Sequence, residues 1–322
     1  MTKHPKAYLA LIYICIVWGT TYLAIRVAVL HYPAFLFAAI RQVIGASIIM
    51  LIGFSMSRKI DWSKNNLWHQ AKVGFLLITV GNGLVSWGER FIPSGVSALI
   101  CSLMPLSAVI INLVSGKKEQ INTPIILGIL TGICGVSLIF KDNIADLGNS
   151  AYLLGILGTF MATTAWALGS VINKKRTAQL NPVFNSGLQL MFGGIFLFLF
   201  SPVMDNYENI NFFQPGVIWP MIYLVSFGSV LAYTAYMYAL KELPVGIVSL
   251  YAYINPLVAV VLGYFILQEK LTWFTAWAFL TIVVGVYLVN YGYRKQHNSK
   301  KDAEDFGDNE VNALPLTKTI NE

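Results

Sequence analysis

Long apolar stretches and short charged segments alternate along the whole chain. A helix needs about 20 apolar residues to cross a lipid bilayer, and the runs without charge reach or approach that length once Gly, Pro and Asn are taken to trim their ends. The pattern predicts ten transmembrane helices, over residues 7–29, 34–55, 71–88, 94–114, 123–140, 152–172, 183–203, 217–240, 245–267 and 272–292. The expected fold class is therefore an all-α integral membrane protein.

The composition agrees with this pattern. Of the 322 residues, 56% are hydrophobic and only 11% are charged, against about 25% charged in an ordinary soluble domain. These values exclude a soluble enzyme, a disordered chain and a disulfide scaffold. The net charge of +7 lies in short clusters between the apolar runs, so it does not indicate nucleic-acid binding.

The positive charges also predict an orientation. With the N-terminus inside, 17 Lys and Arg fall in cytoplasmic segments, and the outer loops hold only Arg90, Lys141 and Lys270. Cytoplasmic loops of membrane proteins carry this excess of positive charge. We expect a multi-pass protein of the cell (inner, cytoplasmic) membrane with both termini in the cytoplasm.

The chain contains a repeat. Residues 93–109 match 244–260 at seven of 17 positions, and 119–122 resemble 269–272 at nearly the same offset. The repeat unit holds five predicted helices, and an odd number makes the second copy enter the membrane from the opposite face. We expect a first half over residues 1–145, an inverted second half over 146–294, and a disordered cytoplasmic tail over 295–322. Inverted repeats are typical of secondary transporters.

Motifs in both halves resemble a known family. The first half carries Trp18-Gly19, Arg41 and the block from Pro93 to Pro105; the second carries Trp166-Ala167, Tyr233, Asn255-Pro256-Leu257, Glu269-Lys-Leu-Thr and Gly285-Val286. Over residues 7–292 the chain resembles the drug/metabolite transporter superfamily, EamA type. The resemblance implies ten helices in two inverted halves, a central cavity, and movement of small metabolites, often outward. It does not imply one particular substrate.

Polar and aromatic side chains inside the predicted helices are candidates for lining that cavity, because such groups are costly in lipid. The candidates are Trp18, Tyr22, Asn82, Ser86, Trp166, Tyr233, Tyr236, Tyr251 and Asn255. The alternative is that they only hold the helices together, since interhelical Ser, Thr and Asn contacts stabilise membrane bundles without any ligand. The pattern leaves both readings open.

Two prolines, Pro105 and Pro256, fall mid-helix at matching positions of the repeat. Each removes a backbone donor and frees a carbonyl one turn earlier. Broken helices mark binding sites in other transporters, and a kink that serves only packing is equally consistent with the sequence.

Two charged residues call for explanation. Arg41 is the only charge well inside a predicted helix; it either clamps a carboxylate or phosphate of the substrate or bonds to backbone carbonyls or Glu89. Glu89, at the end of the third helix, is the only acid positioned to titrate near a pathway. With no acid at mid-membrane we expect downhill uniport, and Glu89 is the coupling residue if protons drive transport.

The expected function is an exporter of small organic metabolites, such as amino acids or related amphipathic solutes, working by alternating access. Its partners are the solute and the bilayer, as a monomer or homodimer. One alternative is a lipid-carrier flippase of the same superfamily. A multi-pass membrane transferase is disfavoured, because the four His are scattered over separate segments and no metal or cofactor motif appears.

Overall fold

The computed structural model describes residues 5–104, 106–107, 110–111, 122–142, 149–174, 181–207, 210–243 and 251–313. All regular structure in these ranges is helical. The α-helices are α1 (Pro5–Val29), α2 (Ala34–Met56), α3 (Lys64–Gly74), α4 (Gly83–Gly88), α5 (Ser94–Cys101), α7 (Thr123–Asp142), α8 (Ser150–Lys174), α9 (Pro182–Met204), α10 (Pro215–Tyr223), α11 (Ala232–Glu242), α13 (Tyr251–Leu267) and α14 (Trp273–Ala313). Two π-helical segments are η1 (Phe75–Asn82) and η3 (Leu224–Leu231).

Seven helical stretches within the described ranges are long and apolar enough to cross a membrane. They are Pro5–Val29, Ala34–Met56, Lys64–Gly88, Ser150–Asn173, Pro182–Met204, Pro215–Tyr236 and Trp273–Gly292. Two shorter apolar helices, Thr123–Gly135 and Ile254–Leu267, fall in the fifth and ninth predicted stretches. The predicted fourth stretch lies only partly within the described residues, where it begins with α5.

The third stretch begins earlier than the apolar pattern predicts. Helix α3 starts at Lys64 because the Ser63 hydroxyl accepts a hydrogen bond from the backbone N–H of Asn66, at 3.2 Å. Such a cap satisfies one of the free donors of the first turn. The polar turn from Lys64 to Gln70 therefore joins the helix although it contributes little apolar surface.

The two π-helical segments occupy equivalent places in the two halves. Both contain 8 residues, and the start of η3 at Leu224 lies 149 residues after the start of η1 at Phe75. This offset is close to that of the sequence repeat. The pattern of apolar residues did not predict these two segments, because the same types of residue occur in π-helical and in α-helical turns. π-Helical turns occur frequently at functional sites.

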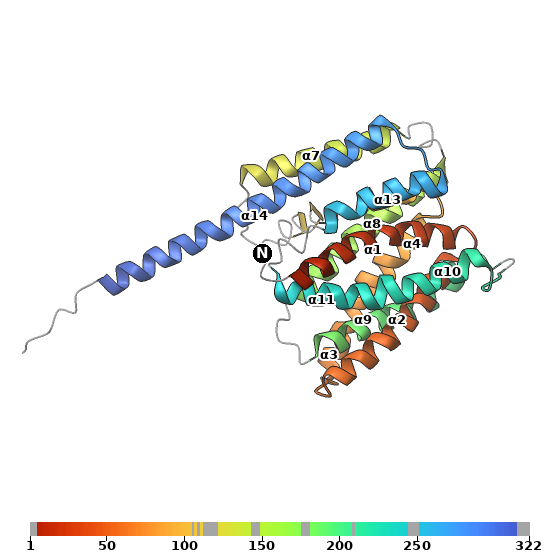
Figure 1. Ribbon diagram of the computed structural model, residues 1–322, viewed down its shortest axis with the longest axis horizontal. Coiled ribbons are helices and arrows are strands. Elements are labelled where there is room, and N and C mark those ends of the chain that lie inside the picture. The colour runs from red at the N-terminus through yellow and green to blue at the C-terminus, as the bar shows by residue number, and fades with distance from the viewer. Residues whose placement is uncertain are drawn as a thin grey trace, which may run out of the picture.

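The helices pack in a reciprocal pattern. Helix α1 of the first half packs on α11 and α13 of the second, while α8 of the second half packs on η1, α4 and α5 of the first. Helix α2 pairs with α9, and α7 pairs with α14 (Figure 1). The contacts of α1 with the second half thus have counterparts in the contacts of α8 with the first half.

Hydrogen bonds fix the α2–α9 pair at both of its ends. At one end the Asp205 carboxylate accepts from the backbone N–H groups of Phe35 and Leu36, at 3.2 and 2.9 Å. At the other end the Asn181 amide donates to the carbonyls of Gly53 and Ser57, both at 2.8 Å. These bonds use backbone groups that helix ends leave unpaired.

Helices α7 and α14 meet through glycines at one side of the bundle (Figure 1). A Cβ atom built on Gly128 would lie 2.5 Å from the Gly285 carbonyl oxygen, and one on Gly285 would lie 2.7 Å from the Gly128 carbonyl oxygen. Small residues allow this close approach of backbones, which supports helix association in membranes.

Helix α14 continues well beyond the predicted end of the tenth stretch. It runs to Ala313 and projects from the bundle (Figure 1), so residues 295–313 of the segment predicted to be disordered are helical. No proline occurs between Trp273 and Pro315, and proline is the residue that most strongly ends a helix. Polarity alone, which carried the prediction of disorder, does not stop a helix that is already formed.

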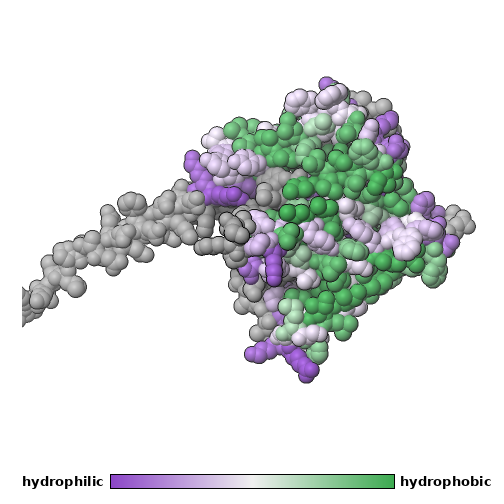
Figure 2. Space-filling view, in the orientation of Figure 1, coloured by the Kyte–Doolittle hydropathy of each residue, from purple (hydrophilic) through white to green (hydrophobic). Residues whose placement is uncertain are grey.

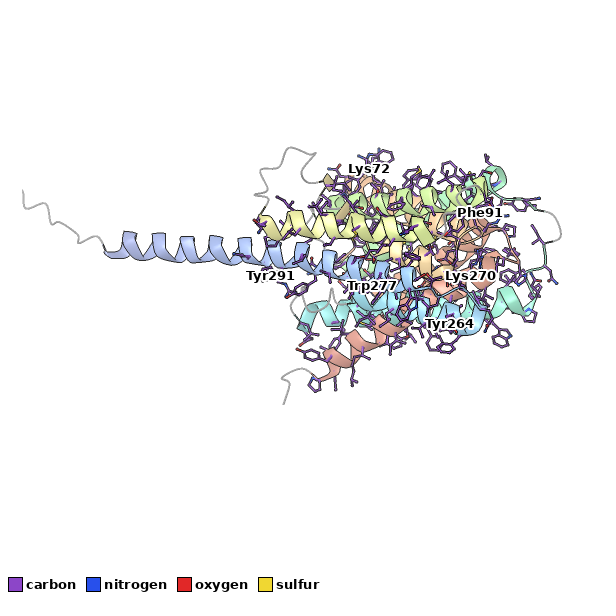
Figure 3. The ribbon with its side chains drawn as sticks, turned by 90° about the horizontal axis from the view of Figure 1, so that it is seen from above. Lys72, Phe91, Tyr264, Lys270, Trp277 and Tyr291 are labelled. Carbon is purple, nitrogen blue, oxygen red and sulfur yellow. The ribbon has the colours of Figure 1, made fainter. Side chains whose placement is uncertain are left out.

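The outside of the bundle is apolar. Figure 2 shows apolar side chains over most of the visible face of the bundle, with the most hydrophilic ones near its edges. Trp277 and Tyr291 lie along the outer side of α14 (Figure 3), and they are 55% and 48% exposed. A soluble protein would not expose so much apolar surface, whereas lipid accommodates it.

Candidate functional site

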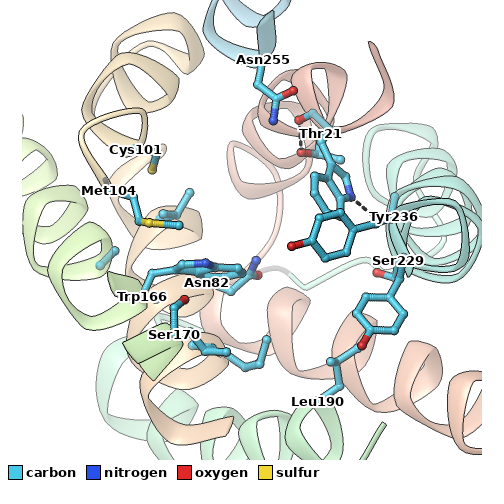
Figure 4. A pocket seen from close by; sticks show the side chains of 18 of the residues that line it. Thr21, Asn82, Cys101, Met104, Trp166, Ser170, Leu190, Ser229, Tyr236 and Asn255 are labelled. Atoms are coloured by element: carbon cyan, nitrogen blue, oxygen red, sulfur yellow. Dashed lines mark hydrogen bonds between the residues drawn. The ribbon is translucent and has the colours of Figure 1, made fainter. Parts of the chain in front are cut away.

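A cavity of about 760 Å³ lies inside the bundle. Its lining residues come equally from the two halves of the chain, including both π-helical segments and helices α1, α2, α8 and α9. In Figure 4, Asn82, Trp166 and Ser170 lie on one side of the space, and Ser229 and Tyr236 lie on the other.

Most of the candidate residues lie on this cavity. Those that line it are Trp18, Tyr22, Asn82, Trp166, Tyr233, Tyr236, Tyr251 and Asn255, and Pro256 of α13 lines it as well. Ser86 is not among the lining residues. It is fully buried one turn after η1 ends, and its hydroxyl donates to the Asn82 carbonyl at 2.9 Å. Pro105 lies outside the described residues.

Three aromatic rings from three helices form one wall. The rings of Trp18 and Tyr251 meet edge to face with centroids 4.9 Å apart, and the Tyr236 ring lies 5.3 Å from that of Trp18. The Trp18 indole N–H donates to the Gly228 carbonyl of η3, at 3.1 Å. Edge-to-face aromatic pairs are stabilising, so this wall is a firm apolar surface.

Asn255 ties this wall to α1. In the amide orientation that satisfies its neighbours, its nitrogen donates to the carbonyls of Cys15 at 3.0 Å and Tyr251 at 2.9 Å. The bond to Cys15 therefore joins α13 to α1, as the packing alternative for the polar residues expects, and the bond to Tyr251 lies within α13; Asn255 also lines the cavity.

Asn82 and Trp166 form the opposite wall (Figure 4). A Cβ on Gly81 would lie 2.9 Å from the Trp166 ring, so the glycine makes room for the indole. The Asn82 side-chain oxygen is buried and has no hydrogen-bond partner. An acceptor in this state is ready to take a donor from a solute.

Several lining residues were not among the candidates. Gln42, Thr163, Ser186, Gln189 and Ser229 also line the cavity. The Ser186 and Tyr233 hydroxyls hydrogen-bond to one another, which joins α9 to α11. The signal that marked two of these residues was present in the sequence. Gln42 adjoins Arg41, and Gln189 is the repeat counterpart of Arg41 at the offset of 148 residues that also relates Trp18 to Trp166 and Gly45 to Gly193.

Arg41 lines the cavity and is only 7% exposed. Its Nε and Nη1 atoms are buried and make no hydrogen bond to the described residues. The carbonyl or carboxylate bonds that a structural role would require are therefore not formed by these atoms. Glu89 acts on Arg41 as a nearby opposite charge.

Glu89 is fully buried behind the cavity and is not among the lining residues. Among the described residues, neither carboxylate oxygen makes a hydrogen bond of standard geometry. The Ser97 hydroxyl and the charges of Arg26, Arg41 and Glu269 surround it. A buried carboxylate without hydrogen bonds is costly in its ionised form.

One end of the bundle is closed by contacts between the halves. The Glu269 carboxylate accepts from the backbone N–H groups of Ser94 and Gly95 at 2.8 and 3.3 Å, and from the Ser94 hydroxyl at 3.0 Å. These donors begin α5, where the helix dipole favours a negative charge. Beside this contact, the Arg26 guanidinium donates to the Glu89 carbonyl.

A turn at the end of α13 positions Glu269. Gln268 has a positive φ of 54°, and the Glu269 N–H donates back to the Gly263 carbonyl at 3.1 Å. A Cβ on Gly263 would lie 2.2 Å from a Glu269 carboxylate oxygen. The glycine therefore leaves the space that the carboxylate occupies.

The cavity extends toward the other end of the bundle. Its lining reaches Asn173 at the end of α8 and Pro182 at the start of α9. Toward the end that Glu269 closes, the lining stops at Ile25, Val85 and Ala98. The arrangement offers aromatic faces, amides, hydroxyls and one guanidinium. No group of three or more potential metal ligands occurs among the described residues.

Known proteins that are described as transporters are similar to this chain over most of its length. YedA of Escherichia coli K12, described as an uncharacterized inner membrane transporter, is 29% identical over 285 residues, which cover 88% of this chain and 90% of YedA. YoaV of Bacillus subtilis, described as an uncharacterized transporter, is 23% identical over 291 residues, 90% of this chain and 99% of YoaV. PecM of Dickeya dadantii is 29% identical over 262 residues, 80% of this chain and 82% of PecM.

One solved crystal structure shares the fold, with a TM-score of 0.61 and 18% identity, and the match covers 90% of this chain and 98% of that one. The sequence model of the EamA-like transporter family matches twice, over residues 5–141 and 153–291. The two matches leave few residues of the bundle uncovered. The protein therefore belongs to the EamA-like transporter family and is a multi-pass membrane transporter of the drug/metabolite type.

Proposed function

We propose that the protein is a secondary transporter that exports small organic metabolites across the cytoplasmic membrane by alternating access. The observation that carries the proposal is the cavity itself. It lies between the two halves, has aromatic walls and polar groups, extends toward one end of the bundle, and is closed at the other by Glu269. Cavities of about 300–1,000 Å³ with apolar walls and a few polar groups suit small organic ligands.

The two halves are proposed to be inverted copies of five helices each. Three observations support this: the reciprocal packing between helices of the two halves, the π-helical segments 149 residues apart, and the two matches to one family model. Inverted repeats provide two related conformations, because exchanging the roles of the halves opens the opposite face.

The orientation identifies the side of the membrane with which the cavity of the described conformation exchanges solute. With both termini in the cytoplasm, Asn173 and Pro182 lie at the cytoplasmic end and the Glu269 contact at the outer end. The described conformation then loads solute from the cytoplasm. Release outside requires the Glu269 contact to break, which makes it the outer gate of this proposal.

The test uses purified protein. A thermal-shift screen against amino acids, purines, sugars and cationic drugs identifies binders, because a ligand of the folded state raises the melting temperature by mass action. Proteoliposomes preloaded with a binder are then assayed for exchange with labelled solute. Exchange that an Asn82→Ala variant loses, while its amount in the membrane stays the same, supports the proposal. Phospholipid movement without any solute exchange indicates the flippase alternative.

A further inference from the structure

We propose that Arg41 is an oxyanion-binding residue, so that the solute bound in the cavity carries one carboxylate or phosphate group. This inference rests on the proposed function, and it narrows the solute to amphipathic organic anions. Among the described residues, Nε and Nη1 of Arg41 lack hydrogen-bond acceptors. Arg41 differs in this from its repeat counterpart Gln189, and it is the charge that the cavity presents to a solute.

The Arg41 guanidinium is buried, and its hydrogen bonding is incomplete. Arg41 is more than nine-tenths buried, and its Nε and Nη1 atoms are buried without a hydrogen bond. A buried donor that is left unpaired carries its full desolvation cost, and the cost is larger for a charged group. A guanidinium also presents a planar fork that matches carboxylate and phosphate oxygens. An oxyanion in the cavity supplies the missing acceptors.

Gln189, the counterpart of Arg41 in the repeat, has hydrogen-bond partners of the kind that Nε and Nη1 of Arg41 lack among the described residues. Gln189 also lines the cavity, but its amide nitrogen donates to the Gln70 side-chain oxygen at 2.6 Å and to that of Asn173 at 3.2 Å. The same position is therefore satisfied by the protein in the second half. Among the described residues, no such acceptor is bonded to Nε or Nη1 of Arg41.

The charge that the described lining of the cavity carries is positive. Arg41 is the only charged residue among the described residues that line it. Glu89 is the acid that acts on Arg41 from behind, but it also faces Arg26. The Glu269 carboxylate is already bound to the start of α5. A single negative charge on the solute therefore complements the cavity.

The walls of the cavity indicate the chemistry of the rest of the solute, apart from its oxyanion group. The Trp18, Tyr236 and Tyr251 wall and the Trp166 indole offer apolar and π surfaces in the same space as Arg41. Such walls bind an organic moiety, whereas a free inorganic anion would leave them unused. The recognised chemistry is an oxyanion attached to an apolar or aromatic group.

The experiment measures binding to the purified full-length protein. The probes are aromatic, heterocyclic and aliphatic monocarboxylates, each paired with its primary amide, which keeps the shape and removes the charge. Matching organic phosphates, inorganic phosphate and primary amines complete the panel. We expect at least one carboxylate or organic phosphate to bind about 10- to 100-fold more tightly than its uncharged partner, the range of one or two charge-assisted hydrogen bonds.

Two variants of Arg41 distinguish a role in solute binding from a role in the stability of the fold. Arg41→Gln copies the repeat counterpart, and Arg41→Met removes the polar group. We expect both to lose the preference for the anion, and we expect neither to melt at a lower temperature than the parent without ligand. Arg90→Gln, which removes a charge from the outer turn, serves as the control that keeps the preference.

Each outcome decides the inference. Carboxylates and organic phosphates are separate arms, so whichever binds identifies the oxyanion. The inference is overturned if no anion of the panel binds, if amides or amines bind as tightly as their anions, or if anion binding survives Arg41→Gln. It is also overturned if both Arg41 variants melt several degrees lower, which is the mark of a structural role. Exchange of uncharged solutes in proteoliposomes would then leave the transporter proposal standing.

Discussion

At the scale of single residues, the cavity contains two kinds of polar side chain. Asn255 and Gln189 have hydrogen-bond partners on neighbouring helices. Arg41 and the Asn82 side-chain oxygen are buried without them. Because buried polar groups are nearly always paired in folded proteins, the unpaired ones are the best candidates for contact with a solute.

This difference predicts opposite behaviour for two asparagines. Asn255→Ala removes two bonds between or within helices and should lower stability by about 1 kcal/mol, the scale of interhelical hydrogen bonds in membranes. Asn82→Ala should leave the melting temperature nearly unchanged and weaken solute binding. Thermal unfolding and binding isotherms on both variants test this. A large loss of stability in Asn82→Ala would show that its amide is structural.

Glu89 carries a prediction about protons. The charge of Arg41 stabilises the ionised Glu89 carboxylate, and an anion bound to Arg41 offsets that charge. Glu89 should then bind a proton more tightly, so at a pH at which Glu89 is partly ionised without ligand, binding of an anionic solute should take up protons from a weakly buffered solution. The groups that face Glu89 are Arg26, Arg41, Ser97 and Glu269. A pH indicator measures the uptake, with Glu89→Gln as the variant that should abolish it.

The result bears on energy coupling. Proton uptake that accompanies anion binding, and that Glu89→Gln removes without removing binding, would make Glu89 the coupling residue of a symporter, which an inward proton gradient drives as import and which would contradict the proposed export. Anion binding without proton uptake would instead favour the downhill uniport that the absence of mid-membrane acids predicts. The Arg41→Gln variant, which we expect not to bind the anion, provides the baseline.

At the scale of the helices, packing is decided by where the backbones approach most closely. Helices α7 and α14 meet at Gly128 and Gly285, where a single added Cβ would lie 2.5–2.7 Å from a backbone oxygen of the partner helix. Gly285→Leu should therefore force the pair apart and cost about 1–3 kcal/mol, the range of overpacking. Thermal unfolding against the exposed Ser137→Ala control tests this, and an unchanged melting temperature would contradict it.

The sequence predicted the helices better than their internal form. Long apolar runs identify membrane helices because lipid imposes both length and composition. Local capping moved the start of α3 to Lys64, and the π-helical turns of η1 and η3 left no compositional trace. A polar tail without proline gave no signal of where α14 would end. Hydropathy cannot register these features, because they depend on hydrogen bonds between particular backbone groups.

The candidate site was predictable only in part, for a related reason. Aromatic and amide residues at helical spacing marked the correct faces of α1, α8, α11 and α13, and eight of the nine candidates lie on the cavity. Ser86 does not, because its hydroxyl bonds to the backbone of its own helix. Whether Arg41 is paired depends on the positions of other helices, which no sequence pattern specifies.

At the scale of the whole molecule, the orientation in the membrane remains the prediction on which the direction of transport depends. The distribution of Lys and Arg predicts that both termini lie in the cytoplasm. Single cysteines introduced at Lys117 and at Lys141 should therefore react with an impermeant thiol reagent from opposite sides of the membrane. Labelling of both from the same side would overturn the predicted topology, and labelling of position 117 from outside and position 141 from the cytoplasm would show that the orientation is inverted.

The gate prediction uses a cysteine that the protein already has. Cys101 lines the cavity and is partly exposed to it. In the described conformation, an impermeant thiol reagent should reach Cys101 from the cytoplasmic side and be blocked from the outside. Glu269→Gln removes the charge that binds the start of α5, so the outer end should open more often. Labelling of Cys101 from outside should rise several-fold, and Cys101→Ser should abolish the signal.

Asp205→Asn is the matched control for this gate. The Asp205 carboxylate also accepts from two backbone N–H groups, those of Phe35 and Leu36. It joins α2 to α9, however, and Asn181 holds the same pair at the opposite end, so its loss should not open the cavity. Equal outside labelling of Cys101 in the parent and in Glu269→Gln would show that the Glu269 contact is not the gate. A rise in both Glu269→Gln and Asp205→Asn would assign closure to the whole outer surface instead of to the contact between α13 and α5.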